Sequence, residues 1–120
     1  MIVPGSKSSN KVSSEEIAKK TLDCLKKNVP EDVPGIAFLS GGQPEIEASK
    51  NLNEINKIND TNFLITFSYG RGLQASALKA FGKNLSDIKK IQEVFAHRAK
   101  MNGLSSKGEW SENLEKEAVA

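Results

Sequence analysis

Two segments of this chain follow one plan: IAFLSGGQ over residues 36–43 and FLITFSYGR over residues 63–71. Each begins with an apolar run typical of a buried strand, and each reaches glycine before a helical pattern begins. A strand that ends in glycine and opens into a helix presents backbone N–H groups and a positive dipole end to an anion. Arg71 adds a fixed positive fork at the second turn. The sequence therefore predicts one phosphate site shared by two neighbouring loops.

The chain before these segments predicts a helix. Residues 1–3 have the character of a strand end, and residues 4–12 are polar and indicate a loop. Ser13 and Glu16 have the spacing of a capping box, which marks a helix start. The helix expected there has one buried face, formed by Ile17, Thr21, Leu22, Leu25 and Val29.

Three more helices are expected downstream, beginning near Pro44, at about Gly72 and after Ser86. The last has an apolar stripe that we expect to face inward, formed by Ile88, Ile91, Phe95 and Ala99. His97, the only histidine, lies among charged residues of that helix and is expected to be exposed. The remaining C-terminal stretch is polar, which predicts a flexible tail with Trp110 as a candidate anchor at its start.

Strands that alternate with helices predict an α/β fold built of parallel βαβ units. The continuous apolar character of both strands indicates burial on both faces of the sheet. The expected elements are only two full strands, one strand end and four helices. Such a sheet would leave open edges and an uncovered face. The sequence is therefore interpreted as a piece of a larger domain.

The composition is that of a small folded domain, with 120 residues, 38% hydrophobic and 27% charged. A net charge of +2 gives no case for a nucleic acid or a membrane surface as partner. The apolar runs are far shorter than a membrane span. The single cysteine, Cys24, cannot form an internal disulfide, which is consistent with a reducing cytoplasm.

The two motifs and their flanks resemble class I fructose-bisphosphate aldolases. The resemblance lies in VPGIAFLSGGQ over residues 33–43 and in TFSYGR over residues 66–71, which LQASALKA follows over residues 73–80. Further along, the same order and spacing are kept by Arg98, Ala99, Asn102, Leu104 and Gly108. The similarity extends over about residues 1–110, and its central motifs are long and specific.

The resemblance implies a fold. That family forms a TIM (β/α)8 barrel, and this chain resembles its C-terminal third: the end of strand six, βα units seven and eight, and an extra C-terminal helix. The implied organisation is a partial barrel domain over residues 1–108 and a flexible C-terminal tail over residues 109–120. The loops after strands seven and eight often bind phosphate in such barrels, and they correspond to the two glycine turns.

The resemblance also implies a reaction. The family reversibly cleaves fructose 1,6-bisphosphate to dihydroxyacetone phosphate and glyceraldehyde 3-phosphate through a lysine Schiff base, without a metal or other cofactor. Its lysine stands three positions before a methionine, in a pattern that matches MIVPG over residues 1–5. We therefore expect the lysine to lie just upstream of Met1 and the 120-residue chain to be inactive. The full-length form is expected to be a cytoplasmic homo-oligomer.

Four residues are carried over as candidate ligands of the substrate phosphate. Ser40 and Gly41 match the family's first loop, and Gly70 and Arg71 match the second, where the arginine contacts phosphate. No residue of the chain is assigned a catalytic or metal-binding role. The chain departs from the family pattern at Gly72, which is usually alanine, and at Pro44, which is usually serine; neither change removes a ligand.

Two other interpretations remain open at this point. The chain could be a non-catalytic module for phosphate binding or assembly. It could also be an inert product of internal initiation or of a truncated gene. The coding sequence upstream of Met1 distinguishes these from an enzyme, because a Lys-Pro pair in frame there would identify the parent as an aldolase.

Overall fold

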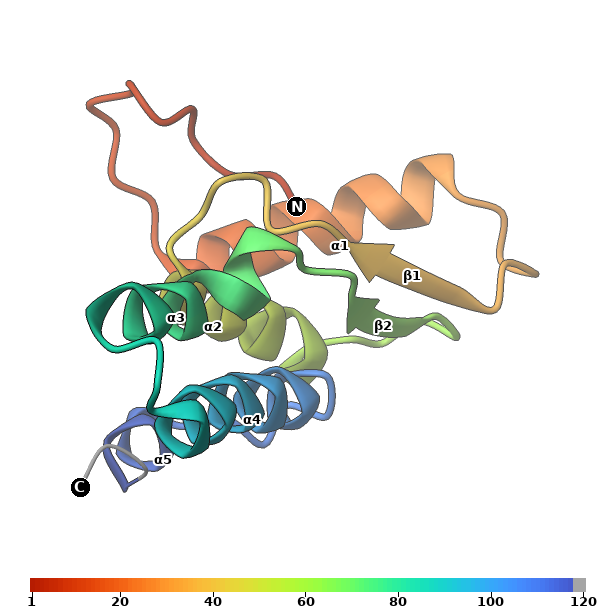
Figure 1. Ribbon diagram of the computed structural model, residues 1–120. Helices are drawn as coiled ribbons and strands as arrows, with labels where there is room; N and C mark the ends of the chain where they lie inside the picture. The colour runs from red at the N-terminus through yellow and green to blue at the C-terminus, as the bar shows by residue number, and fades with distance from the viewer. Residues whose placement is uncertain (118–120) are drawn as a thin grey trace.

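The computed structural model describes residues 1–117, in which helices alternate with strands as far as α3 and two further helices follow (Figure 1). The elements are α1 (Ser14–Asn28), β1 (Gly35–Phe38), α2 (Glu45–Lys57), β2 (Leu64–Phe67), α3 (Arg71–Lys83), α4 (Ile88–Ser105) and α5 (Glu112–Glu117). The predicted α/β order is confirmed.

The predicted first helix is confirmed together with its cap. The Ser13 side chain accepts a hydrogen bond from the Glu16 N–H at 3.2 Å, which satisfies one of the helix's free donors. The predicted face is also the observed one, because Ile17, Thr21 and Leu22 are all buried.

The two strands pair in parallel, with Ile36 opposite Ile65 and Phe38 opposite Phe67. Both arrows point the same way in Figure 1, so the turns that follow them leave from the same edge of the sheet. Just beyond the ladder, the Ser68 N–H donates to the Phe38 carbonyl at 2.7 Å. This bond holds the ends of the strands together where the glycine turns begin.

Only one face of the sheet is covered by the described residues. Ile65 and its neighbours pack on a core with Leu22 of α1 and Leu52 of α2, while Leu64 is 77% exposed. The expectation of burial on both faces is therefore wrong for this chain, because α1 and α2 pack on a single side. The other face exposes Ala37, Leu39, Leu64, Thr66 and Ser68.

The predicted strand end over residues 1–3 does not join the sheet. The Ile2 N–H instead donates to the Thr21 hydroxyl of α1 at 3.0 Å. A ladder needs a row of donors and acceptors on a neighbouring strand. Because the Ile2 N–H is bonded to the Thr21 hydroxyl, it does not donate to a neighbouring strand.

The buried face of α4 differs from the predicted one. Ile88 and Phe95 are 62% and 40% exposed, although Ile91 and Ala99 are partly buried. The face that packs inward is largely polar and comprises Arg98, Met101, Asn102 and Ser105. A search for apolar periodicity selects the wrong side when the buried polar groups bond to one another.

The segment expected to form a flexible tail contacts the rest of the domain through Trp110 and Glu115. The Trp110 N–H donates to Asn53 Oδ1 at 3.0 Å, and the Trp110 side chain is 6% exposed. The short helix α5 follows and brings the buried Glu115 carboxylate to Arg98. The polar composition concealed these long-range contacts. The flexibility predicted for residues 109–120 stays a prediction, and residues 118–120 lie outside the described residues.

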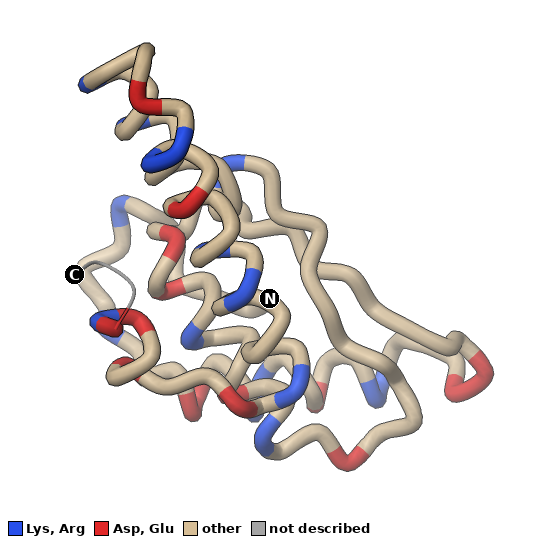
Figure 2. Tube along the Cα trace, turned by 60° about the horizontal axis from the view of Figure 1, so that its bottom comes forward, with Lys and Arg blue, Asp and Glu red and all other residues tan. Residues whose placement is uncertain are grey.

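Charges of both signs are interspersed along the helices, and the two strands carry none (Figure 2). This mixture matches the small net charge of +2. Among residues 1–117, no helix combines the length and apolar character needed to cross a membrane.

Candidate functional site

The first glycine turn is closed by its own backbone and by a side chain of α2. Gly41 and Gly42 have φ values of 61° and 82°, a region that side chains with a Cβ rarely adopt. The Ser40 carbonyl accepts hydrogen bonds from the Gln43 N–H at 3.1 Å and from Gln43 Nε2 at 2.9 Å. Asn51 Nδ2 in turn donates to Gln43 Oε1 at 2.7 Å. The turn is thus fixed on α2.

The second turn forms the N-terminus of α3. Gly70 caps the helix, Arg71 is its first residue, and both are exposed. The preceding residue, Tyr69, is buried, and its hydroxyl donates to the Ala48 carbonyl of α2 at 3.0 Å. Burial raises the pKa of Tyr69, so the hydroxyl keeps its proton and remains a donor. Both turns are therefore attached to α2.

The two turns touch each other at their base. A Cβ added at Gly72 would lie 2.8 Å from Ser40 Cβ, closer than real side chains approach. A Cβ added at Gly42 would lie 3.9 Å from Arg71 Nη2, so the guanidinium reaches the first turn. The structure thus brings Ser40, Gly42 and Arg71 together at one edge of the sheet.

Of the four predicted ligands, only Gly41 lines the hollow that lies beside the first turn. A hollow of about 700 Å³ beside the first turn is lined by Gly41, Gly42, Lys50 and residues of the segment that precedes α1. Gly70 and Arg71 do not line that hollow. The two turns meet by direct contact at the carboxyl ends of β1 and β2, where Gly41, Gly42, Gly70 and Arg71 are exposed.

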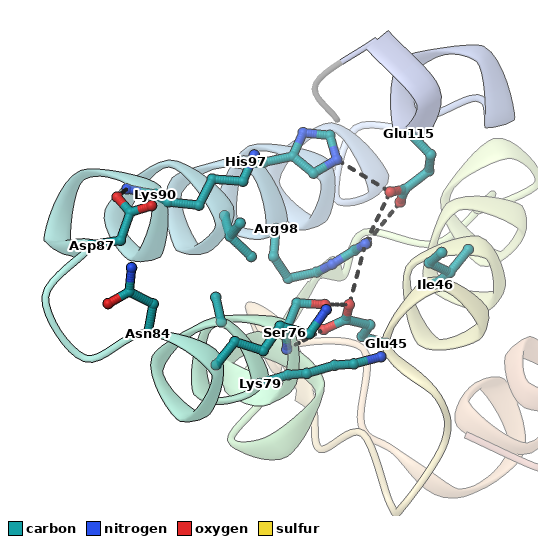
Figure 3. A pocket seen from close by; sticks show the side chains of 13 residues that line it. Glu45, Ile46, Ser76, Lys79, Asn84, Asp87, Lys90, His97, Arg98 and Glu115 are labelled. Atoms are coloured by element: carbon teal, nitrogen blue, oxygen red, sulfur yellow. Dashed lines mark hydrogen bonds and ion pairs between the residues drawn. The ribbon is translucent and has the colours of Figure 1, made fainter. Parts of the chain in front are cut away.

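A buried ion cluster near the start of α2 was not predicted from the sequence (Figure 3). Arg98 of α4 is 4% exposed, and its two terminal nitrogens bind the Glu115 carboxylate at 2.7 and 2.9 Å. Arg98 Nη2 also lies 3.8 Å from Glu45 Oε1 at the start of α2. Glu115 further accepts from Trp110 Nε1 at 2.8 Å. One arginine thus joins the C-terminal segment to the helix that follows the first turn.

The cluster forms one end of a pocket of about 490 Å³ that side chains of α3 and α4 also line. His97 belongs to this pocket, and its Nε2 lies 3.3 Å from Glu115 Oε2. The expectation that His97 is exposed is wrong, because its side chain is only 14% exposed. The sequence does contain a signal for the buried polar face of α4, because its members have the spacing of one helix face: Arg98, Met101, Asn102 and Ser105.

Two opposing effects act on the Glu115 carboxyl. Burial alone would raise its pKa, but hydrogen bonds from Arg98, Trp110 and His97 and the Arg98 charge outweigh burial. The pKa therefore lies below its ordinary value of 4.5. A carboxyl with a depressed pKa stabilises the folded state above its unfolded pKa, and that contribution is lost as pH falls through the folded value.

Acid should therefore loosen the C-terminal segment. We expect the fluorescence of Trp110, the only tryptophan, to change as pH falls from 4.5 through the lower folded pKa of Glu115, because protonation removes its ion pair with Arg98. Glu115→Gln should show a changed emission already at neutral pH and little further change over that range. An acid transition of Trp110 that is the same in both proteins would contradict this assignment.

Comparison with known proteins places these features in a family. The family model for glycolytic class-I fructose-bisphosphate aldolase matches residues 1–120. The chain belongs to the class-I fructose-bisphosphate aldolase family. The resemblance identified from the two glycine motifs is thereby confirmed, and the structure is an α/β fragment of the TIM-barrel type.

Relatives from distant organisms agree with this assignment. Fructose-bisphosphate aldolase 2 of Caenorhabditis elegans is 46% identical over 92% of this chain and 31% of its own length. The cytosolic fructose-bisphosphate aldolase 4 of Arabidopsis thaliana is 48% identical over 90% of this chain and 28% of its own. A solved aldolase structure from Plasmodium falciparum is 39% identical, with a TM-score of 0.87 over 92% of this chain and 32% of its own. The chain thus spans about a third of the aldolases that it matches.

Proposed function

We propose that this chain supplies the phosphate-binding part of a class-I fructose-bisphosphate aldolase. That enzyme reversibly cleaves fructose 1,6-bisphosphate to dihydroxyacetone phosphate and glyceraldehyde 3-phosphate through a lysine Schiff base. The observation that carries the proposal is the meeting of the two glycine turns, where Arg71 reaches Gly42 and Gly72 packs against Ser40. The family match supports the choice of a sugar phosphate as ligand.

Each ligand has a separate role in this proposal. The backbone N–H groups of Gly41 and Gly70 and the Ser40 hydroxyl donate to the phosphate oxygens, and Arg71 supplies the positive charge. An exposed arginine at the first residue of α3 adds to the positive end of that helix. Holding the phosphate fixes the distance from the ketose carbonyl to the lysine that attacks it, which lowers the entropic part of the barrier.

In this proposal β1 and β2 are strands seven and eight of the complete barrel, and α4 is the extra C-terminal helix. The uncovered face of the sheet supports this placement. Ala37, Leu64 and Thr66 are exposed here, and in a TIM barrel the inward side chains of the strands fill the barrel interior. Their exposure is then a consequence of the missing strands.

The remaining parts of the proposal concern the nucleophile and the assembly. The family pattern aligns with residues 1–5 such that the Schiff-base lysine precedes Met1, so we propose that these 120 residues are inactive alone. We propose that the complete enzyme is a cytoplasmic homo-oligomer. The name of the cytosolic fructose-bisphosphate aldolase 4 of Arabidopsis thaliana supports that compartment.

The proposal is tested at Arg71 in a full-length aldolase that contains these residues. Arg71→Ala should weaken the binding of dihydroxyacetone phosphate by about one to two orders of magnitude, because a charge-assisted contact is worth roughly 1.5–3 kcal/mol. Arg71→Lys should recover only part of the affinity, since the two-pronged fork is lost. Binding is measured by isothermal titration calorimetry.

Unphosphorylated dihydroxyacetone is the control ligand. Its affinity should be the same in wild type and Arg71→Ala, because it offers no phosphate for the guanidinium. Equal losses for both ligands would mean that Arg71 supports the fold and does not bind the phosphate, and the proposed role of this turn would then be wrong.

A further inference from the structure

A single carboxylate connects the helices that follow the two glycine turns. Glu45 is the first residue of α2, and Ser76 lies in the second turn of α3. Glu45 Oε2 accepts from the Ser76 backbone N–H at 3.2 Å, and Glu45 Oε1 accepts from the Ser76 hydroxyl (Figure 3). The two helices are therefore joined close to the points where the turns enter them.

Arg98 stabilises this carboxylate from the opposite side. The Glu45 side chain is 16% exposed, and its Oε1 lies 3.8 Å from Arg98 Nη2. A largely buried carboxylate needs such compensation. Arg98 is itself held by Glu115 at 2.7 Å and by Ser49, whose hydroxyl accepts from Arg98 Nη1 at 3.1 Å. Glu45 is thus kept in one orientation by groups from α3 and α4.

We propose that Glu45 is a positioning residue for the phosphate site, acting through Ser76. The inference rests on the proposed function. Glu45 acts by fixing the distance between two sets of donors. The donors in the Ser40–Gln43 turn move with α2, and Gly70 and Arg71 move with α3. An anion is bound by both sets only while their separation is held. Because Gly72 already packs against Ser40, the turns cannot move closer together, so loss of this connection can only let them move apart.

The direction of the effect separates positioning from simple electrostatics. Glu45 carries a negative charge near a proposed anion site, so removing that charge should by itself favour phosphate binding. Loss of positioning predicts the opposite sign. In a full-length aldolase that contains these residues, we expect Glu45→Ala to weaken dihydroxyacetone phosphate binding by about tenfold. The affinity for dihydroxyacetone should not change.

Glu47→Ala is the matched control. Glu47 lies in the same first turn of α2, carries the same charge and is exposed. Its removal should leave the affinity unchanged or slightly higher. Glu45→Ala leaves Arg98 paired with Glu115, so the variant is expected to fold, which circular dichroism and thermal melting would check.

Ser76→Ala supplies a second, independent variant. It should also weaken phosphate binding. The double variant should bind phosphate no more weakly than Glu45→Ala alone, because both changes act on the same contact. If Glu45→Ala matches Glu47→Ala while Arg71→Ala still discriminates the two ligands, the positioning role is wrong and the proposed function stands. If Arg71→Ala fails to discriminate them, the proposed function itself is wrong.

Discussion

Replacing Arg98 with alanine should lower the free energy of unfolding of this chain by about 3–5 kcal/mol, because removal of one partner leaves buried opposite charges uncompensated. Arg98 is 4% exposed and is the cation that Glu115 binds with both carboxylate oxygens. Since small domains are stable by only about 5–15 kcal/mol, a large unfolded fraction is expected. Urea unfolding followed by circular dichroism measures the change.

An exposed ion pair provides the control for this experiment. Lys20 and Glu16 lie 3.1 Å apart on α1, and their side chains are 61% and 51% exposed. Lys20→Ala removes the same charge and should cost at most about 1 kcal/mol, since water screens the pair. If Arg98→Ala costs no more than Lys20→Ala, the buried cluster does not stabilise the fold more than an exposed ion pair does.

Reduction with borohydride in the presence of dihydroxyacetone phosphate should give no specific adduct on the 120-residue chain. A Schiff-base lysine is activated by a desolvated site or by neighbouring cations that favour its neutral amine. Within residues 1–117 every lysine is exposed except Lys50, which is partly buried. A full-length aldolase that contains these residues should be trapped stoichiometrically, so the expected difference is all or none.

Mass spectrometry of the trapped proteins locates any adduct. Lys50 is the residue to inspect first, because it lines the hollow beside the first glycine turn. A stoichiometric adduct on Lys50, or on any other lysine of this chain, would overturn the proposal that the nucleophile lies elsewhere. Low, scattered labelling that is equal with and without the ligand agrees with it.

The candidate phosphate turns could be predicted from the sequence because every signal there is local. The apolar runs, the glycines and Arg71 are contiguous, and parallel strands bring consecutive turns to the same edge. The structure places Ser40 and Arg71 at that edge, and the family match agrees with the motifs. The roles of the four predicted ligands stay predictions until the binding experiments are done.

The buried ion cluster could not be predicted in the same way. Arg98 bonds to Ser49, 49 positions away in the sequence, and Glu45 bonds to Ser76, 31 positions away. Each of these residues alone has the character of a solvated surface group. The polar pattern therefore predicts that the Arg98 side of α4 is exposed and that the segment around Glu115 is a tail.

The sequence by itself determined the strand–turn–helix order, the cap at Ser13 and the glycine turns, because each depends on the conformational preferences of neighbouring residues. Only the tertiary structure decided which polar residues are buried, because a buried charge is stable only when partners from other elements converge on it. Arg98 and Glu115 meet that condition through α5, and Glu45 meets it through α3.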